Sequence, residues 1–158
     1  MDLAAAKTLA ETLIAKHAPS WSFDWHSKKR IFGTCDFGND TIYLSKVLTP
    51  FRPEAEVRNT ILHELAHVLA GPEHNHSAVW KAWATRIGAN PSATAHMSVQ
   101  SREDLVALGA RWILVLPNGE VIKHWFRKPR KNTIDRIPFM YVNGRKEETS
   151  GKLTLEKV

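Results

Sequence analysis

Apolar residues recur with the period of an α-helix in three stretches of the chain. The first stretch, residues 2–18, ends before Pro19, and its apolar positions are Leu9, Leu13 and Ile14. The second begins at Pro53 and ends at Gly71, with an apolar stripe at Val57, Ile61, Leu65 and Leu69. The third is capped by Ser77 and ended by Gly88, with an apolar face of Val79, Trp80, Trp83 and Ile87. These patterns predict three amphipathic helices.

The period of two that is typical of strands occurs between the first two helices. Trp21, Phe23 and Trp25 alternate with polar residues, as in a half-buried strand. Two further short strands are predicted at residues 30–34 and 41–45, joined by a turn-rich segment. We therefore expect residues 21–45 to form a small antiparallel sheet.

The pattern changes after residue 101. Ser101 begins a segment with capping-box spacing, which predicts a short helix near residues 102–108. Pro117-Asn118-Gly119 is a hairpin signal, and the strands that it would join are residues 112–116 and 120–126. Further strands are predicted at 138–142 and 153–155. The chain thus predicts an α+β domain, residues 1–101, followed by a β-hairpin-rich tail, residues 102–158.

The pattern with the clearest chemical meaning lies on the second predicted helix. His63, Glu64 and His67 form the motif H-E-x-x-H. Histidines four residues apart lie about 40° apart around a helix axis, so both imidazoles can reach one ion. The glutamate beside that ion can accept a proton from a metal-bound water. A charged glutamate among apolar neighbours is costly without such a partner. The motif predicts a zinc-dependent peptide hydrolase.

A catalytic zinc ion usually has three protein ligands, so a third residue is needed. Glu73, His74 and His76 follow the motif closely. The metzincin spacing would place the third histidine at position 73, which is glutamate, so that pattern fails. His76 lies directly before the third predicted helix, where Trp80 and Trp83 would hold it against the core. We predict His76 as the third ligand, with His74 as the alternative.

Segments on both sides of this motif support the same interpretation. Residues 27–35 and 41–45 supply two strands before it, and residues 76–80 read His-Ser-Ala-Val-Trp after it. In this order the segments resemble the SprT-like (Spartan-type) metalloprotease family, in which the third histidine opens a segment His-Gly-x-x-aromatic. The family's glycine is Ser77 here. The resemblance implies a zincin-like minimal metalloprotease domain that cleaves peptide bonds in proteins.

The family resemblance also implies a substrate class: proteins attached to or bound on DNA, as in DNA repair. The charge of the tail is compatible with this role. Residues 102–158 contain twelve Lys or Arg against seven Asp or Glu. A basic surface of this kind suits nucleic acid, although a solvated basic surface explains it equally well. The residues that we expect to contact nucleic acid are Lys123, Arg127, Lys128, Arg130 and Lys131.

Cysteine content separates this chain from part of the family. Several SprT-like proteins end in a four-cysteine zinc ribbon, whereas this chain has one cysteine, Cys35, and none in the tail. We therefore expect no structural metal in the tail. Its hairpin-rich pattern is compatible with a ribbon that has lost its metal, but does not decide whether the tail derives from one. The simplest interpretation of Cys35 is a small residue in a strand. His96 is either an oxyanion-stabilising residue or a loop residue.

Two alternatives to a DNA-associated protease remain. One is a site-specific intracellular protease of a regulator such as a repressor. The other is a non-catalytic DNA-binding module that keeps the fold, against which the intact Glu64 argues. The chain shows no signal-peptide pattern and no apolar stretch long enough to span a bilayer. We expect a cytoplasmic protein with no membrane partner.

Overall fold

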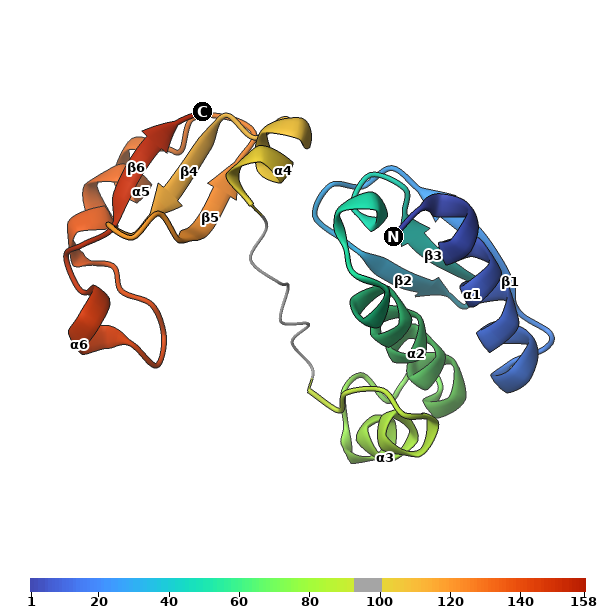
Figure 1. The fold of residues 1–158 in the computed structure, drawn as a ribbon. Helices are drawn as coiled ribbons and strands as arrows, with labels where there is room; N and C mark the ends of the chain where they lie inside the picture. The colour runs from blue at the N-terminus through green and yellow to red at the C-terminus, as the bar shows by residue number, and fades with distance from the viewer. Residues whose placement is uncertain (93–100) are drawn as a thin grey trace. The chain divides into compact units, whose positions relative to one another are not determined.

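A computed structural model describes residues 1–92 and 101–158 (Figure 1). His96 lies outside the described residues. The chain divides into two compact units, Met1–Met97 and Ser98–Val158. The boundary between residues 101 and 102 stays a prediction from sequence. Among the described residues, no helix is long and apolar enough to cross a membrane.

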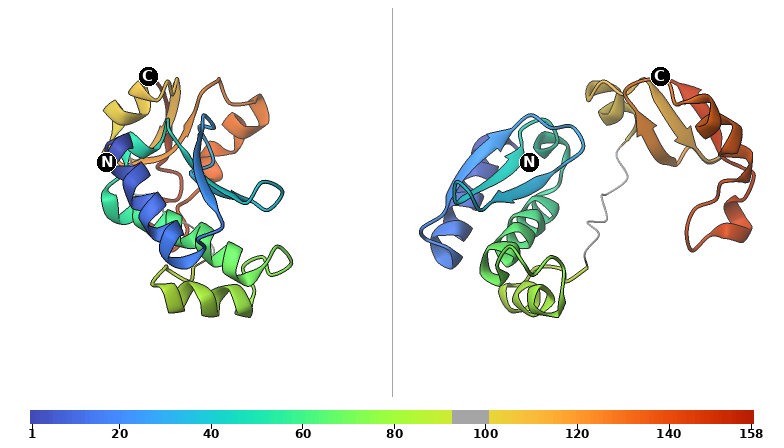
Figure 2. Two further views of the ribbon diagram at one scale, coloured as in Figure 1. Left: turned by 90° about the vertical axis from the view of Figure 1, so that its right-hand side faces the viewer. Right: turned by 180° about the vertical axis from the view of Figure 1, so that it is seen from behind.

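The described residues of the first unit, 1–92, form three α-helices, three strands and one 3-10 turn. The order is α1 (Leu3–His17), β1 (Ser22–His26), β2 (Gly33–Asp36), β3 (Thr41–Ser45), η1 (Thr49–Phe51), α2 (Glu54–Ala70) and α3 (Ala78–Ile87). The predicted positions of the three helices are confirmed. Figures 1 and 2 show α1 and α2 on the same face of the sheet. The core between them contains Ala10, Ile14, Val57, Ile61 and Leu65.

The sheet of this unit is mixed, and the prediction of an antiparallel sheet is wrong in one pairing. The strand order is β1-β3-β2; β3 is antiparallel to β2 but parallel to β1. Four of the five residues of β3 are buried, so the most apolar strand takes the central place. The β2 strand begins at Gly33 rather than Arg30, and it forms one edge of the sheet.

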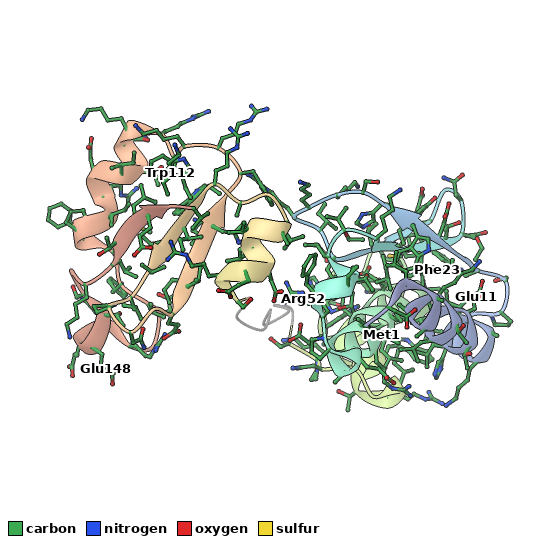
Figure 3. All side chains as sticks on the ribbon, turned by 45° about the horizontal axis from the view of Figure 1, so that its top comes forward. Met1, Glu11, Phe23, Arg52, Trp112 and Glu148 are labelled. Carbon is green, nitrogen blue, oxygen red and sulfur yellow. The ribbon has the colours of Figure 1, made fainter. Side chains whose placement is uncertain are left out.

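The charged side chain of Arg52 is deeply buried in the first unit. Arg52 is 1% exposed, and its guanidinium donates to the carboxylate of Glu56 over 3.3 Å. The amino group of Met1 donates to the backbone carbonyl of Arg52 over 2.6 Å. Figure 3 labels both residues. A buried charge needs such partners to offset the loss of water. These contacts hold the start of α1 against the segment that leads into α2.

The second unit is a small sheet with short helices. The order is α4 (Arg102–Ala107), β4 (Trp112–Val115), β5 (Val121–Trp125), α5 (Lys131–Arg136), η2 (Ile137–Phe139), α6 (Lys146–Thr149) and β6 (Thr154–Lys157). The strand order is β5-β4-β6, with both pairings antiparallel. The predicted α4 helix and the hairpin of β4 and β5 are confirmed.

The tail is less rich in hairpins than its sequence suggests. The strand predicted at 138–142 is absent, and a 3-10 turn begins at Ile137 instead. Pro138 has no N–H for a strand ladder, and Phe139 is 80% exposed, so this segment has no buried face to pair.

The ion pair between Arg145 and Glu120 joins the segment before α6 to the residue directly before β5 through two hydrogen bonds, of 2.6 and 3.0 Å.

Candidate metal centre

Helix α2 separates an apolar face from a face that carries the predicted metal ligands. Val57, Ile61 and Leu65 are 0% exposed and pack into the core. His63 and His67 are only partly buried, because they lie on the other side of the helix. Gly71 then ends the helix with φ of 95°, a value that glycine adopts without strain. The division of faces therefore leaves two imidazoles free of the core.

The turn between α2 and α3 brings a third imidazole to the first two. The Nε2 atom of His76 lies 3.1 Å from Nε2 of His63 and 3.1 Å from Nε2 of His67, and the latter two are 3.3 Å apart. His76 has φ of 47°, in the left-handed region that non-glycine residues rarely adopt. Ser77 directly after it caps α3 by accepting the N–H of Trp80.

Trp80 lies against all three imidazoles. Its ring centroid is 4.7 Å from that of His63, 5.3 Å from that of His67 and 4.6 Å from that of His76. The side chain is 0% exposed, so it is fixed by the core on its other side. The contact that was predicted between Trp80 and His76 is therefore present. Val79, predicted on the same apolar face, is instead 42% exposed.

The three nitrogen atoms fit a tetrahedral metal ion. Zn–N bonds of about 2.0–2.1 Å at tetrahedral angles separate the nitrogens by roughly 3.3–3.4 Å. The observed separations of 3.1–3.3 Å are close to this value. Burial, and secondarily the neighbouring histidines, lowers the pKa of His63 and of His67 to about 4. Both imidazoles are therefore neutral near pH 7, the form that binds a metal.

Glu64 is the carboxylate of this centre. Its residue is 8% exposed, and burial raises its pKa to about 7. Hydrogen bonds from the thiol and the backbone N–H of Cys35 act in the opposite direction, because they stabilise the ionised form. A buried carboxyl group with such a pKa can accept and release a proton near neutral pH.

The other ligand candidates point elsewhere. Nε2 of His74 lies 3.4 Å from a carboxylate oxygen of Glu73, and the two side chains are 37% and 68% exposed. Within the described residues, the group able to hold an ion consists of His63, His67 and His76. This geometry favours His76 over His74 as the third ligand.

The basic residues predicted to contact nucleic acid are all exposed on the second unit. They lie on β5, after it and at the start of α5: Lys123, Arg127, Lys128, Arg130 and Lys131. The ammonium of Lys123 lies 5.4 Å from the ring centre of Trp125, and that of Lys128 lies 5.7 Å from the ring centre of Trp112. These two tryptophans are direct partners across β4 and β5.

Sequence reasoning missed one part of the site. Cys35 was interpreted only as a small strand residue, yet it contacts Glu64. Gly33 lies beside the same side chain, where a Cβ atom would come within 3.1 Å of a Glu64 carboxylate oxygen. The spacing of Gly33 and Cys35 shows only that they share one face of a strand, and no pattern in the sequence relates that face to Glu64.

Comparisons with known proteins found the following similarities. A model of the SprT-like family matches residues 4–101. Among solved structures, the crystal structure of the metallopeptidase zymogen of Methanocaldococcus jannaschii jannalysin is similar, with a TM-score of 0.45 and 16% sequence identity. That likeness covers 65% of this chain and 88% of that chain. None of the curated proteins compared with the chain matches it.

Proposed function

This chain belongs to the SprT-like family and is a metallopeptidase, and on that premise we propose that it is a zinc-dependent endopeptidase that cleaves proteins associated with DNA. The observation that carries the zinc proposal is the convergence of three Nε2 atoms, separated by 3.1–3.3 Å, beside a buried carboxylate. His63, His67 and His76 would hold the ion, and Glu64 would act as the general base.

The roles of the protein groups follow from their chemistry. When bound, zinc supplies Lewis acidity, which makes water more acidic and polarises a carbonyl oxygen. Glu64 accepts the proton of the attacking water and then donates it to the leaving amine, because its pKa near 7 suits both steps. The indole of Trp80 keeps the three imidazoles in place during this reaction.

The peptidase proposal is tested with the full chain and its Glu64→Gln variant. Zinc content is measured by elemental analysis, and cleavage is followed on a panel of unfolded and DNA-binding proteins. We expect one zinc per chain in both proteins and cleavage that is roughly 10²- to 10⁴-fold slower in the variant. Cleavage by the variant at the wild-type rate would contradict the role of Glu64.

The DNA-associated substrate is supported by family membership and by the exposed basic residues of the second unit. Phosphate contacts from lysine and arginine give an affinity that falls steeply with salt, by a slope of about 0.7 per phosphate on single strands. The ammonium groups of Lys128 and Lys123 lie within cation–π distance of the rings of Trp112 and Trp125. These contacts favour a surface on which a phosphate chain is bound.

A four-residue variant tests this surface. Replacing Arg127, Lys128, Arg130 and Lys131 by glutamine should flatten the dependence of DNA affinity on salt. The matched control removes two lysines and two arginines that are exposed on the first unit: Lys16, Arg30, Lys46 and Arg58. Equal DNA affinity in the wild type and the first variant would remove the tail from the proposal. A cleavage rate that does not change when DNA is added would instead favour a site-specific protease of a regulator.

A further inference from the structure

The edge strand β2 lies beside α2 at the level of Glu64. Gly33 and Cys35 share the face of β2 that is turned toward this helix. A Cβ atom at position 33 would lie 3.1 Å from both Cγ and Oε1 of Glu64, and 2.6 Å from Cγ2 of Thr60. Only glycine fits between these two residues of α2. The absent side chain therefore leaves the space into which Glu64 extends.

Cys35 makes directed contacts with the same carboxylate. Its thiol and its backbone N–H both donate hydrogen bonds to Glu64. The thiol is half-buried, and the residue of Glu64 is 8% exposed, so neither group exchanges these contacts freely for water. Two donors from one strand residue favour one orientation of the carboxylate over the others that its rotatable bonds allow.

From this geometry we propose that β2 is a positioning element for the general base: Cys35 orients the Glu64 carboxylate, and Gly33 leaves the space in which it lies. The inference rests on the proposed function of Glu64. A base held in one orientation loses less entropy on reaching the transition state, and a displacement of about 1 Å is enough to slow a reaction substantially. Cys35 acts through Glu64 and does not itself touch the substrate.

The first test compares Cys35→Ala, which removes the thiol donor, with Cys35→Ser, which retains a donor of similar size. We expect Cys35→Ala to lower kcat roughly tenfold with KM unchanged, the effect of one weak hydrogen bond to a charged group. Cys35→Ser should recover most of this loss. Thr34→Ala is the control, because Thr34 lies on the same strand and faces the other side. Zinc content should be equal in all four proteins.

The second test needs neither activity nor metal. Cys35 is the only cysteine of the chain, so its S–H stretching band in the infrared spectrum has a single source. The band of a thiol that donates a hydrogen bond lies at lower frequency than that of a free thiol. We expect Glu64→Ala, which removes the acceptor, to shift the band to higher frequency. Thr34→Ala should leave it in place.

The outcomes separate this inference from the proposed function. A wild-type protein that cleaves no protein contradicts the proposed function, while the S–H band still decides whether Cys35 contacts Glu64. If the wild type cleaves and Cys35→Ala cleaves equally well, β2 has no positioning role. The inference is also overturned if Cys35→Ser is no better than Cys35→Ala, if zinc is lost together with activity, or if Glu64→Ala does not move the band.

Discussion

The indole of Trp80 stands edge-on to the imidazole of His76, with ring centroids 4.6 Å apart and ring planes at 88°. Trp80 is buried in the core and His76 belongs to a turn, so this contact joins a rigid element to a loop. Edge-to-face pairs stabilise beyond the area that they bury. The position of the third imidazole thus depends on a residue that holds no metal itself.

Two replacements of Trp80 should distinguish the effect of its volume on stability from the effect of its ring contacts on zinc affinity. Trp80→Ala leaves a cavity and should lower the free energy of unfolding by about 3–5 kcal/mol. Trp80→Phe keeps an aromatic ring and loses no hydrogen bond to the described residues, because the indole N–H has no partner among them. We expect Trp80→Phe to bind zinc more tightly than Trp80→Ala in a chelator competition assay. Equal zinc affinity in the two variants would contradict the role of the ring.

The ligand set can be tested by comparing two nearby histidines. His76→Ala should lose zinc and all cleavage, because a site with two protein ligands binds the ion weakly. His74→Ala should keep full zinc occupancy, since His74 is turned toward Glu73 on the surface. Elemental analysis after dialysis against a weak chelator measures both. Zinc loss in His74→Ala with retention in His76→Ala would reverse the assignment.

A methyl group at position 33 should damage the site in two ways. Gly33→Ala brings a Cβ atom within 2.6 Å of Thr60 Cγ2, and overpacking of this kind costs about 1–3 kcal/mol of unfolding free energy. Thr60→Ser removes that Cγ2 atom and keeps the hydroxyl that donates to the carbonyl of Glu56. In the double variant we expect thermal stability to recover while kcat stays low, because the contact with Glu64 remains. Full recovery of both would place the damage at Thr60 alone.

The Glu120–Arg145 ion pair should make the stability of the second unit depend on pH. Hydrogen bonds from Arg145 hold the pKa of Glu120 below its ordinary value. The folded state therefore favours the ionised carboxylate. Its stabilising effect is complete above the unfolded pKa of about 4.3 and is lost as the pH falls through the lower folded value. Calorimetry of the wild type and Glu120→Gln should show a difference in Tm that is constant near pH 7 and shrinks below pH 4. Glu147→Gln, on the exposed α6, is the control.

The helices and the ligand set could be predicted because each depends on local spacing. The period of Val57, Ile61 and Leu65 determines which face of α2 is buried, and the same period brings His63 and His67 together. The strand order depends on burial across the whole sheet, and alternation at Trp21, Phe23 and Trp25 cannot distinguish parallel from antiparallel pairing. For that reason the sheet was only partly predicted.

The contact between Cys35 and Glu64 had no local signal of this kind. The two residues lie on different elements, and only the packing of β2 against α2 brings them together. In the second unit, Pro138 and the exposed Phe139 replace a predicted strand by a 3-10 turn. The five basic residues are exposed, but exposure and charge alone do not identify a bound molecule, so their contact with nucleic acid stays a prediction.

The left-handed backbone of His76 has a consequence for protein engineering. Glycine and asparagine adopt a φ near 47° at a lower cost than other residues, and the difference is about 1 kcal/mol. Selection of a variant library for heat resistance in the presence of a chelator would therefore reward glycine or asparagine at position 76. Such clones would survive the screen and be catalytically dead, so a library of this protein has to be screened with metal present.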